Sequence, residues 1–213
     1  MNKLILVVLI VAITVFFLKS EWFGFNAEPG TFRGDGSEQI VVFTSENCGN
    51  NCREAVAYLS ASGMAFEELK LDENEANTKL FRQLGGADTV PYLSSGYQKV
   101  TGFYPQDYLS VLAAARGLSV LDDSMRAVYV HHFDKNNIPL LVMYGTTWCV
   151  ECAAMREYCN DRKIKLVDWD VETDVAAAKR YEKLAGRDYP LVYYGARRMN
   201  GFSELALRRL MRR

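Results

Sequence analysis

The chain lacks an excess of charge of either sign, and it has few histidines. It has 213 residues, with 25 lysines and arginines against 26 aspartates and glutamates, a net charge of −1 at pH 7. Without a basic excess or an acidic tail, the sequence gives no electrostatic signal for nucleic acid. The two histidines, His131 and His132, are adjacent and lack ligand spacing to any other candidate. We therefore expect no nucleic-acid partner, no metal and no cofactor.

Polar residues are nearly absent from the N-terminus. Residues 4–18 are apolar except for one threonine, and a lysine stands on each side. This run is shorter than the about 20 residues that span a bilayer, and near the upper limit for the core of a signal peptide. Trp22 and Phe25 come shortly after it and are typical of an aromatic belt at a membrane surface. Cleavage would need small residues at the cut, for which Ser20 and Ala27 are the nearest candidates.

We predict an uncleaved signal anchor, or transmembrane helix, over residues 1–25, which holds the chain to a membrane through residues 4–18. A lone N-terminal anchor usually exports the rest of the chain, and paired cysteines suit an oxidising compartment. We therefore expect the C-terminal part on the exported side, periplasmic or extracytoplasmic. Residues 26–38 contain three glycines and a proline without periodicity, which predicts a linker.

The remaining sequence contains one unit twice. Residues 40–44 and 140–144 are typical of buried strands, and each leads to a pair of cysteines. In each copy a helix, a strand, a second helix, a proline-led strand, a hairpin and a Gly-Phe pair come next. The ranges predicted for the first three of these are 53–62, 66–71 and 75–84 in the first copy, and 153–162, 166–171 and 175–185 in the second.

The landmarks of the two copies keep a steady spacing. Cys52 and Cys152 are 100 positions apart, and Pro91 and Pro190 are 99 apart. Each copy has about 75 residues, enough to bury one core. The intervening stretch predicts one more helix.

That extra helix is expected at residues 124–134, with Ser124 as its cap. It is either a spacer or the first helix of the second unit, and we favour the second unit because the helix runs straight into that unit's first strand. The predicted domains are therefore 39–116 and 117–213.

This order of elements resembles the thioredoxin fold and, within it, the glutaredoxin family. The residues that carry the resemblance are Trp148-Cys149-Val150-Glu151-Cys152, Thr89-Val90-Pro91 and Thr101-Gly102-Phe103. The layout is similar to two-domain protein disulfide oxidoreductases and covers about 150 residues. The resemblance implies an α/β fold with two tandem thioredoxin-like domains after the N-terminal membrane helix. Each domain would be a four-stranded mixed sheet flanked by helices.

The cysteine pairs are the candidate catalytic residues. A thiolate attacks a disulfide and is released when a second thiol attacks the mixed disulfide. A helix N-terminus favours the thiolate, which suits Cys149 as an exposed nucleophile and Cys152, one turn inward, as the resolving thiol. Cys48 and Cys52 have one extra residue between them, which we place in the turn that holds Cys48. Three alternatives are open for this pair: it is redox-active, it is a static disulfide, or it belongs to another kind of site. Zinc held by all four thiols would require the two units to face each other.

The resemblance also suggests substrate-binding residues. It implies cis bonds at Val90-Pro91 and Tyr189-Pro190, facing the cysteines, with backbone open to an extended substrate. The alternative is that each proline only begins a strand. Trp148 would give substrates an apolar wall.

Two further residues have predicted roles near the second pair. Glu151 is expected to tune the site, because a carboxylate disfavours the neighbouring thiolate and makes Cys149 less acidic. Cys159 is expected to be a buried apolar residue and not a redox partner.

Two features that the resembled family uses for glutathione are missing. Ser45 and Thr146 stand where that family commonly has a lysine, and the later Gly-Gly-x-Asp run is absent from both copies. Here Gly201-Phe202-Ser203 replaces it in the second copy, where Ser203 also suits a helix cap. We therefore favour protein thiols and disulfides as partners over glutathione. The predicted function is a membrane-tethered thiol–disulfide oxidoreductase. The alternatives are a non-catalytic binding or assembly module with structural disulfides, and a glutathione-dependent glutaredoxin.

Overall fold

The computed structural model describes residues 29–212. The predicted anchor over residues 1–25 lies outside the described residues. Within residues 29–212, no helix has both the length and the apolar character that crossing a bilayer requires.

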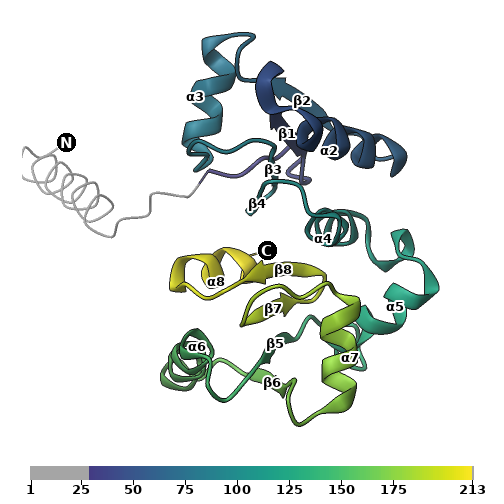
Figure 1. Ribbon diagram of the computed structural model, residues 1–213, viewed down its shortest axis with the longest axis vertical. Coiled ribbons are helices and arrows are strands. Elements are labelled where there is room, and N and C mark those ends of the chain that lie inside the picture. Colours follow the sequence, from purple (N-terminus) through teal and green to yellow (C-terminus); the bar gives the residue numbers. More distant parts are fainter. Residues whose placement is uncertain (1–28, 213) are drawn as a thin grey trace, which may run out of the picture.

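Two four-stranded mixed sheets form the centre of the fold, and they have the same strand order (Figure 1). In the first, the order is β2-β1-β3-β4; β1 is parallel to β2 and antiparallel to β3. In the second, the order is β6-β5-β7-β8 with the same directions. The strands are β1 (Ile40–Thr44), β2 (Glu67–Lys70), β3 (Tyr92–Ser95), β4 (Gln98–Thr101), β5 (Leu141–Gly145), β6 (Leu166–Asp170), β7 (Leu191–Tyr194) and β8 (Arg197–Asn200). The predicted repeat is confirmed.

Helices flank each sheet because the strands are apolar on both faces. Every residue of β1 and of β5 is buried, so each central strand needs cover from two sides. The helices are α2 (Asn50–Ala61), α3 (Glu75–Gln83), α4 (Pro105–Arg116), α5 (Asp123–Tyr129), α6 (Val150–Asp161), α7 (Val175–Lys183) and α8 (Glu204–Met211). Short 3₁₀ turns occupy Glu46–Cys48, Leu118–Val120 and Val130–His132.

The helices after the cysteines begin three residues earlier than predicted. Asn50 and Val150 are the first residues of α2 and α6. Cys149 is itself the N-cap of α6, because its Sγ accepts a hydrogen bond from the Cys152 N–H at 3.0 Å. The prediction that Ser124 caps α5 is wrong: Asp122 is the cap, and its side chain accepts from the backbone N–H of Met125.

Helix α4 is shared by the two halves of the molecule. Its residues Tyr108, Val111 and Leu112 belong to the core of the first unit, whereas Ala113 belongs to the core of the second. Figure 1 shows α4 lying between the two sheets. One helix therefore fixes how the units meet.

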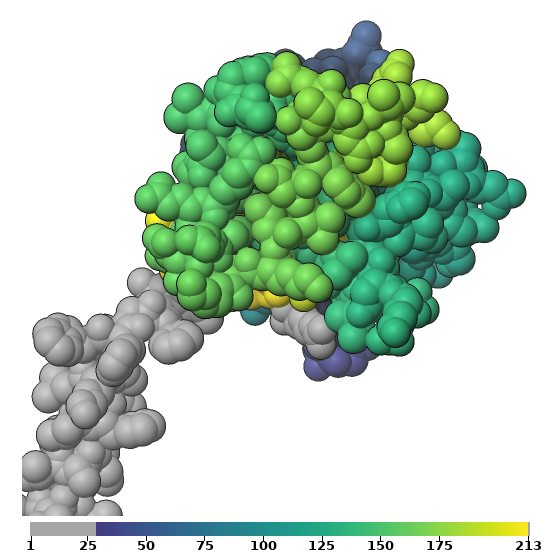
Figure 2. Space-filling view, turned by 90° about the horizontal axis from the view of Figure 1, so that it is seen from below, coloured from purple at the N-terminus to yellow at the C-terminus, as the bar shows by residue number. Residues whose placement is uncertain are grey.

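Helix α5 packs on the second sheet, as expected. Met125, Val128 and Tyr129 belong to the same buried cluster as Val142 and Tyr193. In the space-filling view, the teal surface of the α4–α5 segment continues directly into the green surface of the second unit (Figure 2).

The described part of the segment before β1 also takes part in the fold. Thr31 exchanges backbone hydrogen bonds with Gly96, at 3.0 and 3.1 Å. Glu38 forms an ion pair with Arg197 of β8, with Oε1 and Nη2 2.7 Å apart. The sequence predicts only a linker here, whereas the described part of this segment binds to both units. Its composition gives no sign of partners more than 60 residues away along the chain.

The core of the second unit contains a neutral histidine. His132 is fully buried, lies 3.0 Å from the Tyr144 hydroxyl through Nε2, and stacks on Tyr193 with ring centroids 4.3 Å apart. Burial, reinforced by the nearby His131 and by Arg180, lowers its pKa from 6.5 to about 3.

We predict that His132 makes the protein less stable in acid. The unfolded chain takes up a proton at His132 below pH 6.5, but the folded chain does so only near pH 3. The free energy of unfolding therefore falls as pH drops through this window, by about 1.4 kcal/mol per pH unit from this group. Urea denaturation of the His132→Asn variant between pH 4 and 7 should give a shallower slope than the wild type. The exposed neighbour provides the control: His131→Asn should keep nearly the wild-type slope, because burial is the main cause of the low pKa of His132. Equal slopes in all three proteins would contradict the prediction.

Candidate active site

Each unit carries one disulfide at the start of the helix that follows its first strand. Cys149 and Cys152 are bonded, with Cα atoms 5.2 Å apart. Cys48 and Cys52 are also bonded, with Cα atoms 5.7 Å apart. Each pair closes within its own unit, so each unit has a separate site.

The second disulfide lies at the positive end of α6. Cys149 caps the helix, and Cys152 lies in its first turn. Free N–H groups and the helix dipole at this end favour a thiolate on Cys149 when the disulfide is open. Cys152 is fully buried, as expected for a resolving thiol. Cys149 is only 6% exposed, whereas the sequence predicts an exposed nucleophile. Cys149 belongs to an apolar cluster whose partly buried members include Tyr189 and Phe202.

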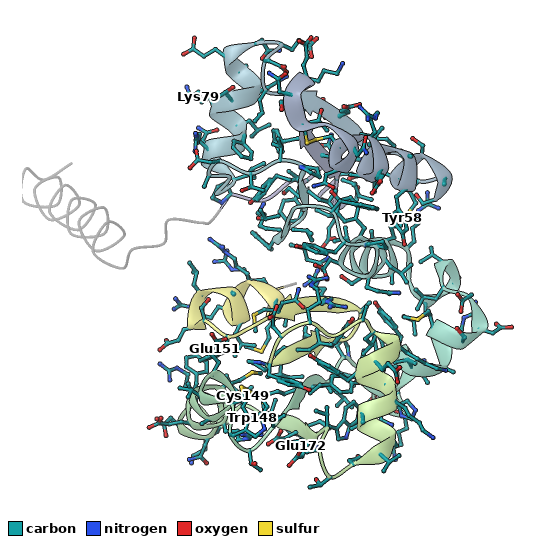
Figure 3. The ribbon with its side chains drawn as sticks, in the orientation of Figure 1. Tyr58, Lys79, Trp148, Cys149, Glu151 and Glu172 are labelled. Carbon is teal, nitrogen blue, oxygen red and sulfur yellow. A yellow bond between two sulfur atoms is a disulfide. The ribbon has the colours of Figure 1, made fainter. Side chains whose placement is uncertain are left out.

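Trp148 projects beside the disulfide and is held by two contacts. The residue is 64% exposed. Its indole lies edge-on to Tyr189, with ring centroids 5.7 Å apart, and its Nε1–H donates to Glu172 Oε1 at 2.9 Å. Tyr189 in turn stacks on Tyr181. Trp148 therefore offers a fixed aromatic surface next to Cys149, as Figure 3 shows.

The proline and Gly-Phe landmarks meet in the structure. The bonds Val90-Pro91 and Tyr189-Pro190 are cis, as predicted. In both units the glycine N–H of the Gly-Phe pair donates to the proline carbonyl at 2.8 Å, from Gly201 to Pro190 and equivalently from Gly102. This bond ties the Gly-Phe loop to the proline strand.

The phenylalanine of each pair fastens the same loop to the helix that carries the cysteines. The rings of Tyr158 and Phe202 are 5.7 Å apart at 62°, and those of Tyr58 and Phe103 have the same geometry. In the second unit, Cys149, Cys152, Tyr189 and Phe202 share one apolar cluster. The structure thus brings together the predicted residues of the second site.

The Val90 side chain packs into the core of the first unit. It is half-buried and lies against the cluster of Phe43, Phe81 and Tyr92, beneath β1 and α3. Pro91 beside it is buried. The side chain of Val90 therefore contributes to packing, and only its backbone is left for the predicted contact with an extended substrate.

Glu151 makes a contact that sequence reasoning missed. Its Oε2 accepts a hydrogen bond from the backbone N–H of Phe202 at 2.8 Å. The two residues are 51 positions apart, so no local pattern predicts the contact. The second residue of α6 therefore holds the Gly201-Phe202 loop.

An ion pair supports the loop that precedes Trp148. Arg156 donates to both carboxylate oxygens of Asp168, at 2.6 and 3.2 Å, and also to the backbone oxygen of Thr146 at 3.3 Å. Below the disulfide, Gly145 leaves room for sulfur, since a Cβ there would lie 3.0 Å from Cys152 Sγ. Neither feature can be predicted from the sequence, because both depend on the register of β5 with β6 and on the packing of α6 against them.

The first site has the same scaffold with different chemistry. Gly49, at φ +68°, takes the N-cap position of α2, and Cys48 lies one residue further out in a 3₁₀ turn. The extra residue is therefore where it was predicted. Thr44 stands where the second unit has Gly145, and its hydroxyl donates to Glu68 Oε1 at 2.6 Å.

A cavity of about 400 Å³ lies next to the first disulfide. It is lined by residues that include Cys52, Arg53, Glu68 and Lys70. Half-buried Cys48 is also more open to solvent than Cys149.

Cys159 takes no part in either site. It is a free thiol, 2% exposed, in the core of the second unit, and burial raises its pKa. This confirms the expectation of a buried apolar residue.

Several known proteins are similar to this chain. A sequence model of the glutaredoxin family matches residues 40–96. Glutaredoxin 3 of Escherichia coli is 34% identical over 82 residues, which are 38% of this chain and 94% of the relative. A solved glutaredoxin from Archaeoglobus fulgidus is 23% identical, with a TM-score of 0.31, covering 34% of this chain and 86% of its own. The first two thioredoxin domains of Naumovozyma dairenensis Eps1p are 12% identical, with a TM-score of 0.27, covering 89% and 98%.

We predict that Glu151→Gln lowers the pKa of the Cys149 thiol. Removing a carboxylate from the first turn of α6 favours the thiolate, by up to about one pKa unit. The measurement is the rate of iodoacetamide alkylation of the reduced protein against pH, followed at Cys149 by mass spectrometry. Glu157→Gln, on an exposed turn of the same helix, is the control for net charge. An unchanged Cys149 profile in Glu151→Gln would show that the carboxylate does not tune the thiol.

Proposed function

Because this chain belongs to the glutaredoxin family of the thioredoxin-like superfamily, we propose that it is a thiol–disulfide oxidoreductase acting on protein thiols and disulfides. The observation that carries the proposal is the Cys149–Cys152 disulfide at the N-terminus of α6, with Cys149 as the cap. A fold of this family supplies the scaffold, and the cysteine pair supplies the chemistry.

The proposed reaction uses the two thiols in sequence. The Cys149 thiolate attacks one sulfur of a substrate disulfide, forms a mixed disulfide and releases one substrate thiolate. The Cys152 thiolate then attacks Cys149 Sγ, closes the Cys149–Cys152 disulfide and releases the second substrate thiolate. Two electrons pass from the protein to the substrate, and the reverse sequence oxidises a substrate dithiol. Cys152 is the more deeply buried of the two thiols, at 0% exposed against 6% for Cys149, which favours this order.

Substrate binding is assigned to the residues around Cys149. Trp148, Tyr189 and Pro190 would form the surface against which a polypeptide lies, and in the first unit the backbone of Val90 and Pro91 would do so. The first pair, Cys48 and Cys52, would be a second redox centre or a docking module. We assign the two domains to residues 39–116 and 117–213. Trapping a substrate on Cys149 distinguishes this proposal from a non-catalytic module with structural disulfides.

We predict that Cys152→Ser traps the substrate. With no resolving thiol, the reduced variant should accumulate a mixed disulfide at Cys149 when mixed with a disulfide-containing protein such as insulin. Non-reducing electrophoresis and mass spectrometry of the adduct measure this. Cys149→Ser should give no adduct at the second site, and Cys159→Ser, the matched buried thiol, should turn over like the wild type. A Cys152→Ser protein without any adduct at Cys149 would refute the catalytic proposal in favour of a structural disulfide.

A location outside the cytoplasm is part of the proposal. The apolar run at residues 4–18 would tether the chain, with residues 26–38 leading to the two domains on the exported side. Alkaline phosphatase fused after Arg213 should therefore be active in a bacterial host, because this reporter needs an oxidising compartment. Deleting residues 1–25 should abolish reporter activity. An inactive full-length fusion, with an active cytoplasmic reporter fused at the same point, would overturn this location.

A further inference from the structure

The carboxylate of Glu151 accepts a backbone hydrogen bond at the second site. Its partner, the Phe202 N–H, lies just before Ser203, the N-cap of α8. A backbone N–H without another partner can donate to an anionic group, in a bond stronger than one between neutral groups. The hydrogen bond to Glu151 therefore occupies the Phe202 N–H, so that this donor is not available to a ligand.

Glu151 and the Gly201-Phe202 loop lie in the region where a substrate of Cys149 would bind. Glu151 stands between Cys149 and Cys152 in the chain, and Gly201, next to Phe202, donates to the carbonyl of Pro190. A Cβ added to Gly201 would lie 3.0 Å from Glu151 Oε2, so the carboxylate and this loop are in close contact. The carboxylate therefore lies between the helix of the cysteines and the proline loop.

A second carboxylate lies on the other side of the site. Glu172 accepts the hydrogen bond of the Trp148 indole N–H. In Figure 3, Cys149 and Trp148 lie between the labelled Glu151 and Glu172. Two carboxylates, Glu151 and Glu172, therefore contact residues of the second site.

From this arrangement, which rests on the proposed function, we infer that Glu151 is a specificity-determining residue: it occupies the Phe202 N–H and makes the second site discriminate against anionic disulfides. An anionic substrate loses the N–H it would use and meets negative charge instead. Neutral or cationic polypeptide segments are accepted. The first unit has Asn51 at the same helix position, so this selectivity is a property of the second site.

The test compares disulfides of different charge in one protein. In the full chain with Cys48 and Cys52 changed to serine, the protein is reduced with dithiothreitol, freed of reductant, and mixed with oxidised glutathione (anionic), bis(hydroxyethyl) disulfide (neutral) or cystamine (cationic). Each reaction oxidises one Cys149/Cys152 dithiol and releases two small thiols. The rate is followed by alkylation of the remaining thiols and by the tryptophan fluorescence, to which Trp148 beside the disulfide contributes.

The measured quantity is the ratio of the glutathione-disulfide rate to the cystamine rate. A change in the pKa or nucleophilicity of Cys149 affects both rates alike and cancels in the ratio. We expect Glu151→Ala to raise the ratio about tenfold, the effect of one nearby charge on substrates of opposite sign. Glu151→Gln should raise it less, because its amide oxygen still accepts from Phe202. Glu157→Gln, with the same loss of charge further along α6, should change it less than about twofold.

Salt gives an independent readout. In wild type, raising sodium chloride to about 0.5 M should bring the ratio toward that of Glu151→Ala, and it should affect that variant much less. If all three disulfides react and neither Glu151 variant changes the ratio relative to Glu157→Gln, the inference is wrong while the proposed function stands. If the reduced chain reacts with none of them, nor with insulin, the proposed function of the second site fails.

Discussion

A buried carboxylate fixes the arrangement of the two halves of this protein. Asp107 of α4 is 5% exposed and lies 2.7 Å from Arg198 and 2.8 Å from Arg187, both in the second unit. A buried charge without a partner is strongly destabilising, so Asp107 must keep these arginines. Since α4 also contributes to both apolar cores, the two disulfide sites are held on one common frame.

On this frame, the repeat gives two sites that are alike in scaffold and different in chemistry. Both have the cis proline, the bond from the Gly-Phe glycine and the tyrosine–phenylalanine contact. They differ at a few positions close to sulfur. Thr44 replaces Gly145, and Val56 stands where Arg156 pairs with Asp168. The first unit thereby has a carboxylate, Glu68, bound to a hydroxyl, whereas the second has its carboxylate bound to a guanidinium. These differences give the two sulfur pairs different electrostatic surroundings.

Much of the fold could be predicted because its signals are local or periodic. Buried strands, amphipathic helices and evenly spaced landmarks identified both units, and the resemblance to the glutaredoxin family implied the cis prolines. The predicted starts of α2 and α6 are three residues too late, because the caps of these two helices, Gly49 and Cys149, are residue types whose capping role composition does not reveal. Asp122 took the capping role expected of Ser124, since both side chains suit a cap and only the local backbone chooses between them.

The residue pattern alone was enough to identify the two thioredoxin-like units, the cysteine pairs at their helix starts and the position of the extra residue in the first pair. The folded structure was needed to show what surrounds these sulfurs. The bond of Glu151 to Phe202, that of Trp148 to Glu172 and the place of Gly145 beneath Cys152 all join residues from different elements. Spacing along the chain carries no information on such contacts, because strand register and helix packing bring these residues together only in the folded protein.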